Sequence, residues 1–223
     1  MLDALPRSRA AEAIDWGNIM RSMLLAAAVS VALSTTALAG ADLSGLPSAL
    51  LGGAAAEGTE HNLPQPPIGA ITVGALSITL GTTTLDEVVA VLGGTISTAA
   101  DGPAKAAWLC YEQKLRGQTS FFWFVANDAG AEGKVNLVGA NFQLGETPTQ
   151  QCQAPKEDLS ALDFSVPGLG ASEAQLQSRF GMVDARNGMV AYSNQKGTTI
   201  ETVNYLIRDG VVAGIGATVI GAQ

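Results

Sequence analysis

Two cysteines and a single histidine are the residues of this 223-residue chain with the most specific chemistry. Cys110 and Cys152 can form a disulfide in an oxidising compartment. Closing the loop between these two cysteines stabilises a fold by about 4 kcal/mol in the chain-entropy model. The alternative is a pair of buried free thiols. His61 lies in a segment rich in glycine, alanine and proline, which offers no fixed partner to orient an imidazole. We therefore predict a disulfide and no catalytic histidine.

Motifs for nucleophilic and metal-dependent chemistry are missing from the sequence, which has no Gly-x-Ser-x-Gly elbow, zinc-ligand spacing or EF-hand loop. Asp86-Glu87 suits the first turn of a helix, Glu157-Asp158 falls in a linker, and Gly168–Gly170 is a weak anion-binding signal. We predict a protein that is not an enzyme, without catalytic residues, metal ligands or cofactor. The alternative is a periplasmic hydrolase or small-ligand binder that uses carboxylates in a groove between two halves of the chain.

Aromatic residues are few but concentrated in one region. Seven of the Trp, Tyr and Phe residues lie between positions 108 and 142, and residues 121–124 read Phe-Phe-Trp-Phe. A strand with this sequence carries rings on both faces, and only one face packs against a helix. We predict that Trp108, Tyr111 and Trp123 form an exposed surface that binds a protein partner. The alternative is that the rest of the chain covers them.

The charge pattern and the N-terminal region predict export. The net charge is −8 and no run of Lys or Arg occurs, which argues against nucleic acid as the partner. Residues 23–33 are apolar, follow Arg21 and precede Ala37-Leu38-Ala39, the pattern of a signal peptide over residues 1–39. Residues 1–19 resemble a mis-assigned extension before a start at Met20. The apolar run is shorter than the roughly 20 residues that a membrane-spanning helix needs. We expect a periplasmic or secreted protein without a membrane span.

The remaining chain divides into a tether and two similar units. Residues 40–70 are rich in Gly, Ala and Pro and predict a flexible tether. Strand-like residues 76–80 precede a capping box formed by Thr84 and Glu87, a helix, and Gly93. The same order recurs at a constant offset, with residues 164–166 as the strand. Its second capping box is formed by Ser172 and Gln175, and Gly181 follows the helix.

Three strand-like runs follow each predicted helix. They cover residues 106–113, 119–126 and 135–144 in the first unit, and 189–194, 200–208 and 211–220 in the second. Alternation places Val211, Ala213, Ile215, Ala217 and Val219 on one face of the last run. We predict an α+β fold of two tandem units, 71–149 and 150–223. Each unit would have the order strand, helix, three strands, with the helix packed on a small antiparallel sheet.

Residues 80–93, Leu-Gly-Thr-Thr-Thr-Leu-Asp-Glu-Val-Val-Ala-Val-Leu-Gly, resemble a helix of the SmpA/OmlA-type outer-membrane assembly proteins. Trp108 and Tyr111 resemble that family's first strand, and residues 203–215 resemble its closing hairpin. A tandem pair of such units is similar to the beta-lactamase-inhibitor-protein fold. The resemblance implies an exported, soluble binding or inhibitor-like module with a protein partner in the cell envelope or the medium.

Overall fold

The computed structural model describes residues 58–101, 104–127, 133–143 and 152–221, all of which lie in one compact unit, Thr36–Gln223. The predicted signal peptide (1–39), its extension (1–19) and the tether as far as residue 57 lie outside the described residues. None of the helices within the described ranges combines the length and apolar character needed to cross a membrane.

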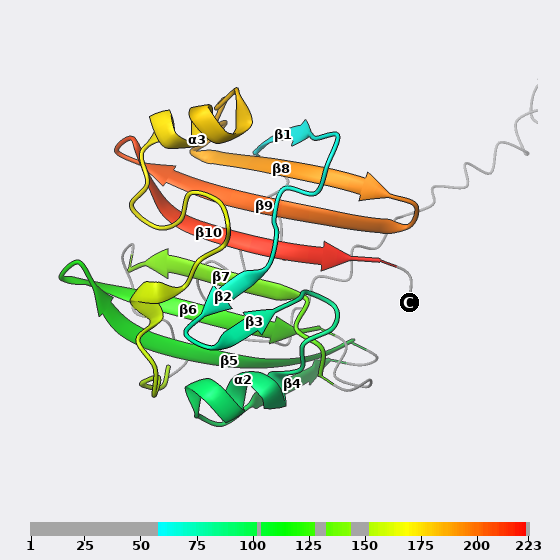
Figure 1. Cartoon of the computed structure of the whole chain (residues 1–223), viewed down its shortest axis with the longest axis vertical. Coiled ribbons are helices and arrows are strands. Elements are labelled where there is room, and N and C mark those ends of the chain that lie inside the picture. The colour runs from blue at the N-terminus through cyan, green and yellow to red at the C-terminus, as the bar shows by residue number, and fades with distance from the viewer. Residues whose placement is uncertain (1–57, 102–103, 128–132, 144–151, 222–223) are drawn as a thin grey trace, which may run out of the picture. The chain divides into compact units, whose positions relative to one another are not determined.

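The described residues are mostly strand (Figure 1). The strands are β1 (Thr59–Asn62), β2 (Ile71–Val73), β3 (Leu76–Ile78), β4 (Ser97–Asp101), β5 (Ala104–Leu115), β6 (Gln118–Ala126), β7 (Leu137–Phe142), β8 (Met189–Lys196), β9 (Thr199–Arg208) and β10 (Val211–Ile220). The helices are α2 (Leu85–Leu92) and α3 (Glu173–Phe180), and a short 3-10 helix, η2, covers Leu159–Ala161.

Eight of the strands form one sheet, in the order β1-β8-β9-β10-β7-β6-β5-β4. The predicted α+β fold of two separate helix-on-sheet units is therefore wrong. The two predicted three-stranded sheets join edge to edge, because Leu137–Asn141 of β7 pairs antiparallel with Gly214–Thr218 of β10. Separate sheets would leave the backbone groups of these two edges unpaired, and joining them satisfies those groups.

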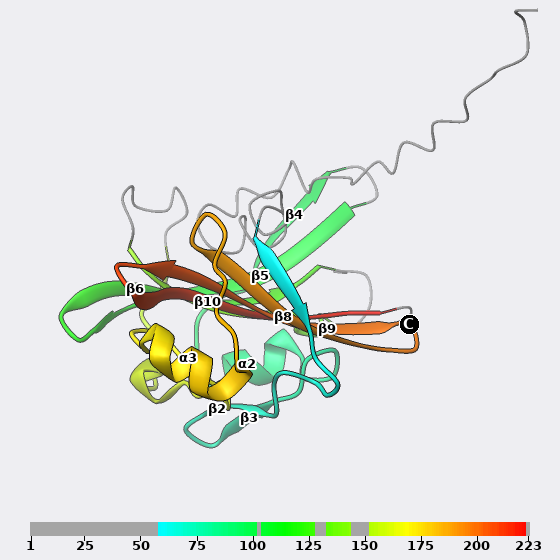
Figure 2. The same cartoon turned by 90° about the horizontal axis from the view of Figure 1, so that it is seen from above.

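Both helices begin with the predicted capping boxes. The Thr84 hydroxyl accepts from the Glu87 N–H at 3.3 Å, and the Glu87 carboxylate accepts from the Thr84 N–H at 2.7 Å. Ser172 and Gln175 form the corresponding pair at α3. Figure 2 shows that both helices and the β2-β3 hairpin lie on the same side of the large sheet. We call this side the helix face and the other the open face.

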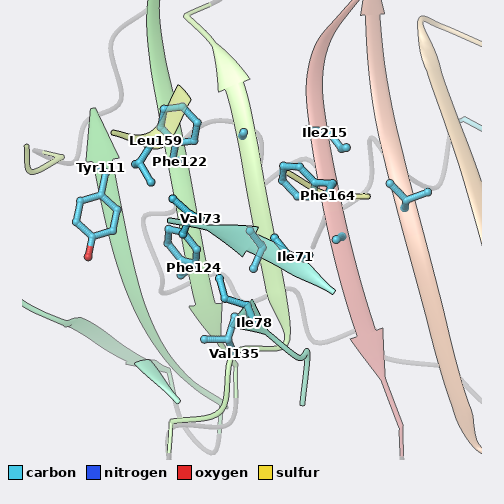
Figure 3. Close-up of a cluster of buried hydrophobic side chains, with 14 of the residues drawn as sticks. Ile71, Val73, Ile78, Tyr111, Phe122, Phe124, Val135, Leu159, Phe164 and Ile215 are labelled. Carbon is cyan, nitrogen blue, oxygen red and sulfur yellow. The ribbon is translucent and has the colours of Figure 1, made fainter. Parts of the chain in front are cut away.

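The main core fills the space between the large sheet and the elements on its helix face (Figure 3). Tyr111, Phe122 and Phe124 extend from β5 and β6 toward Ile71 and Val73 of β2. Another buried cluster lies on the open face and contains Ala106, Trp108, Cys110, Phe121, Trp123, Val125 and Leu137. The Phe-Phe-Trp-Phe segment therefore does carry rings on both faces, and both sets are buried.

Local predictions differ from the structure at residues 164–166 and 59–62. Residues 164–166 form no strand, because the Asp163 carboxylate accepts from the Ser165 N–H at 2.8 Å and holds a turn in which Ser165 has φ 60°. Thr59–Asn62, placed within the flexible tether, instead forms β1. Its parallel pairing with β8 and the stacking of His61 on Tyr192, with ring centroids 5.3 Å apart, hold the strand in place.

Candidate functional site

The predicted disulfide is confirmed. Cys110 of β5 and Cys152 are joined, with their Cα atoms 4.8 Å apart. The adjoining backbone pairs as well, since the Gln153 N–H donates to the Cys110 carbonyl and the Glu112 N–H donates to the Gln153 carbonyl, each at 2.9 Å. The bridge therefore fixes the chain after residue 152 along the outer edge of β5.

The three aromatic residues predicted to bind a partner are buried and do not share a face. Trp108 and Trp123 belong to the open-face cluster and are 5% and 0% exposed. Tyr111 is 0% exposed in the main core, where its hydroxyl donates to the Gly93 carbonyl at 2.6 Å and burial raises its pKa to about 12. These residues form no common exposed surface. Among the described residues, the indole N–H groups of both tryptophans have no hydrogen-bond partner.

The carboxylates singled out in the sequence support local structure. Glu87 caps α2, and hydrogen bonds from the Thr84 backbone and then its hydroxyl lower the Glu87 pKa. The pKa of Asp158 is lowered by hydrogen bonds from the Ser160 hydroxyl and backbone, and from Gln113. Over the described ranges, no group of three or more His, Cys, Asp or Glu side chains could hold a metal ion. Gly170 donates its N–H to the Val212 carbonyl at 2.8 Å, so that amide is engaged in strand-like pairing.

A pocket of about 420 Å³ opens where the two halves of the sheet meet. It lies between the start of β6, the end of β7 and the β9-β10 hairpin, and we call it the junction pocket. Its polar lining residues are Gln118, Thr119, Gln143, Arg208 and Asp209, and its apolar lining residues are Phe142, Val211 and Ala213.

The junction pocket forms because β7 is shorter than its neighbours. Pairing between β7 and β10 stops at Asn141 and Gly214, so Val211–Ala213 extend beyond the end of β7. A β-bulge between Val212 and Gly214 interrupts the alternation of β10 at this point. Val212 instead joins the main core, and its N–H donates to the Ala171 carbonyl at 2.8 Å. The prediction that Val211 and Ala213 share a face of β10 with Ile215 is therefore wrong, because the bulge shifts the alternation.

Tight hairpins hold the pocket walls. The β5-β6 turn contains Arg116 and Gly117 with φ 52° and 82°, and the β9-β10 turn contains Asp209 and Gly210 with φ 51° and 75°. Two consecutive residues with positive φ are the signature of a type I′ turn, whose twist matches that of its strands. Gln118 and Val211 each follow directly after one of these turns, so their backbone positions are fixed.

The pocket combines an exposed apolar residue with two charges. Val211 is 38% exposed. The Arg208 Nη1 group donates to the carbonyls of Asn187 and Ile207, both at 3.4 Å, which holds the guanidinium near the backbone of Gly188. Asp209 is the one carboxylate among the described lining residues. Other described pockets of about 230 and 250 Å³ have no carboxylate among their lining residues.

One part of the junction pocket has a local signal in the sequence. Asp-Gly between two strand-like runs is typical of a tight hairpin, and Asp209-Gly210 forms the turn between β9 and β10. Gln118, Thr119 and Arg208 were not proposed as site residues. Arg116-Gly117 and Asp209-Gly210 are signals for two tight turns, but only the pairing of β7 with β10 brings both to one end of the sheet.

No family model, curated protein or solved structure matches the chain. The resemblance to the SmpA/OmlA-type and beta-lactamase-inhibitor-protein families stays a prediction from the quoted residues.

Proposed function

We propose that the protein is an exported binding module that recognises a protein partner through the junction pocket. The signal-peptide pattern of residues 1–39 supports export. The Cys110–Cys152 disulfide supports it independently, because such bonds persist in oxidising compartments.

The junction pocket carries the proposal. Its apolar lining, Phe142, Val211 and Ala213, adjoins hydrogen-bonding side chains, among them Gln118 and Thr119. Protein interfaces combine an apolar centre with polar residues around it in the same way. Two tight hairpins fix the backbone on both sides, so little conformational entropy is lost when a partner binds.

Binding explains this pocket better than catalysis does. General acid–base hydrolysis by carboxylates needs two of them on opposite sides of the substrate. The described lining of the junction pocket contains Asp209 alone, and Glu87 and Asp158 each cap a helix elsewhere. We therefore favour a partner-binding module over the hydrolase alternative.

Affinity capture with matched variants tests this function. The full chain is produced in an exporting host, and the exported protein is used as bait on envelope and medium fractions of the source cell. Val211→Glu adds a charge to the apolar wall of the pocket. Ile220→Glu adds the same charge at the other end of β10, where Ile220 is 63% exposed.

We expect a protein that wild type and Ile220→Glu retain equally and that Val211→Glu retains at least about tenfold less, as for a residue at the centre of an interface. Equal capture by all three baits contradicts the proposed site, as does the absence of any specifically retained protein. Circular dichroism and thermal unfolding of each bait confirm that the variants fold.

A further inference from the structure

We infer that residues 40–57 pack across the open face of the large sheet, instead of forming the flexible tether that their composition predicts. The surface that they cover is a line of four residues that pair directly across β8, β9, β10 and β7. These residues, which we call the central row, are Ala191, Asn204, Gly216 and Gly139. This contact within the chain is separate from the junction pocket, whose lining shares no residue with the row.

The central row lies on the open face and carries few side-chain atoms. Gly139 pairs with Trp123 of the open-face cluster, and residues directly opposite each other in an antiparallel pair share a face. The row continues from Gly139 through Gly216 and Asn204 to Ala191. Glycine within a strand often marks a place where another backbone approaches closely. The row therefore offers room for a polypeptide segment directly against the backbone of the sheet.

Burial indicates that the central row is covered. Asn204 and Ala191 are only 7% and 8% exposed. The neighbours of Asn204 in the row are Ala191 and Gly216, and such small residues cannot shield it from water. Both helices and the β2-β3 hairpin lie on the other side of the sheet, so none of the described helices supplies the cover (Figure 2). We therefore assign the cover to residues outside the described ranges.

A buried acceptor beside the central row needs a donor. Asn141 pairs with Phe121 of the open-face cluster, so it lies on the open face, and it is 8% exposed. Its Nδ2 group donates to the Phe142 carbonyl at 3.0 Å, whereas its Oδ1 atom has no hydrogen-bond partner among the described residues. Buried polar atoms are nearly always paired. A polypeptide segment that crosses this face brings backbone N–H groups, which are suitable donors.

The described chain begins next to the central row. A Cβ atom added at Gly58 would lie 2.9 Å from the Cβ atom of Met189, so residue 58 runs beside the start of β8. Met189 is two residues before Ala191 and shares its face. Four adjacent strands span about 14 Å, which roughly five extended residues can cross. Residues 40–57 are therefore long enough to cover the whole row.

The other gaps in the described ranges lead to other parts of the sheet. Residues 102–103 and 128–132 connect β4 with β5 and β6 with β7. Residues 144–151 lead from β7 to Cys152, which is bonded to Cys110 of β5. The ends of these segments all lie on the half of the sheet away from β8 and β9. Residues 222–223 are too few to cover four strands, so residues 40–57 remain as the cover.

Residues 40–57 have the composition of a segment that can be buried. They contain four leucines, Leu43, Leu46, Leu50 and Leu51, and the rest are mostly alanine, glycine and serine. Removing apolar side chains from water is the main favourable contribution to folding. The small residues among the leucines allow the segment to approach the glycines of the central row closely.

Nuclear Overhauser measurements on the full chain, produced in an exporting host, test this packing. We expect cross-peaks from the leucine methyl groups of residues 40–57 to the Ala191 methyl group, the Asn204 side-chain amide and the Gly216 Hα atoms. Leucine signals at random-coil positions without these cross-peaks overturn the inference. Cross-peaks that are exclusively intermolecular, in a mixture of labelled and unlabelled protein, overturn it as well, because a second copy then supplies the cover.

Charge substitutions within the segment test its contribution to stability. We expect Leu46→Asp/Leu50→Asp to lower the midpoint of thermal unfolding by at least about 5 °C, because two side chains leave apolar contacts. The control, Ser44→Asp/Ser48→Asp, adds the same charges to the same segment and should change the midpoint by less than about 2 °C. An unchanged midpoint in the leucine variant overturns the inference, as does an equal fall in both variants.

A substitution in the central row tests the same contact from the side of the sheet. Gly216→Val adds a side chain where the segment approaches, and thermolysin should cleave within residues 40–57 at least about tenfold faster than in wild type. Gly168→Val is the matched control, since a Cβ atom added at Gly168 would meet no heavy atom within 4 Å. Circular dichroism confirms that each variant folds. Equal cleavage of the folded Gly216→Val variant and wild type contradicts the inference, and the leucine variants decide it if Gly216→Val does not fold.

Discussion

The open-face aromatic cluster and the junction pocket lie in the same sheet and differ in what the sequence makes conspicuous. Trp108 and Trp123 stand out by residue type, and both are buried. Gln118 and Val211 are ordinary residues that follow tight turns, and they line the pocket that we propose as the binding site. The large aromatic side chains here stabilise the sheet, and the accessible site arises where regular strand pairing ends.

The largest effect that separates the two regions is expected from Trp123→Ala. This indole is fully buried, so its removal should lower the free energy of unfolding by about 3–5 kcal/mol. Denaturant unfolding followed by circular dichroism measures the change. A loss below about 1 kcal/mol would show that the ring is not part of a packed core, and would restore the aromatic surface as the binding site.

Removal of the disulfide tests how the aromatic cluster is anchored. The double variant Cys110→Ala/Cys152→Ala should unfold with a free energy about 2–4 kcal/mol lower than wild type, because the bridge restricts the unfolded chain. Partner capture through the junction pocket should be unchanged in conditions where the variant is folded. Loss of capture by the folded variant would show that the pocket depends on the disulfide and the aromatic cluster.

A smaller effect is expected on the helix face. Tyr111→Phe removes the hydroxyl that donates to the Gly93 carbonyl and should cost about 1–2 kcal/mol. Burial raises the pKa of Tyr111 to about 12, so its neutral form is favoured in the folded state. This stabilisation is complete below the unfolded pKa near 10 and is lost as the pH rises toward 12.

Unfolding measured from pH 8 to 12 should therefore show a steeper loss in wild type than in Tyr111→Phe. Identical alkaline profiles would show that Tyr111 is as accessible to solvent as in the unfolded chain, contrary to its position in the core.

The smallest effect on stability is expected at the pocket itself. Val211→Ala removes a partly exposed side chain and should change the free energy of unfolding by less than about 0.5 kcal/mol. The same change should reduce partner capture, although less than Val211→Glu does. A large loss of stability without any loss of capture would assign Val211 to the core and would reverse the contrast between the regions.

Local signals allowed much of the secondary structure to be predicted. Thr84 with Glu87, and Ser172 with Gln175, predicted both helix starts because a capping box involves residues only three apart. The disulfide followed from the presence of two cysteines and the expected export. The predicted surface shared by Trp108 and Tyr111 did not follow this rule of alternation, because the two residues are three apart in β5 and therefore lie on opposite faces.

The sequence pattern could not predict which distant strands pair with one another. No local feature specifies that β7 pairs with β10, and this contact turns two predicted sheets into one. The bulge after Val212 shifts one residue of β10 without a glycine or proline at the extra position, so the alternation predicted the wrong faces there. Both features create the junction pocket, which explains why its residues were not proposed from sequence.

The most direct test of the central claim is a two-dimensional ¹⁵N NMR spectrum recorded before and after addition of the captured partner. The binding account predicts that the backbone signals of Gln118, Thr119 and Val211 shift, while the indole N–H signals of Trp108 and Trp123 keep their positions. Both indole N–H groups have no hydrogen-bond partner in the part of the chain that the structure describes, and their signals would respond strongly to a new acceptor. Shifts of the indole signals with unchanged junction-pocket signals would contradict the account and place the partner on the open-face aromatic cluster.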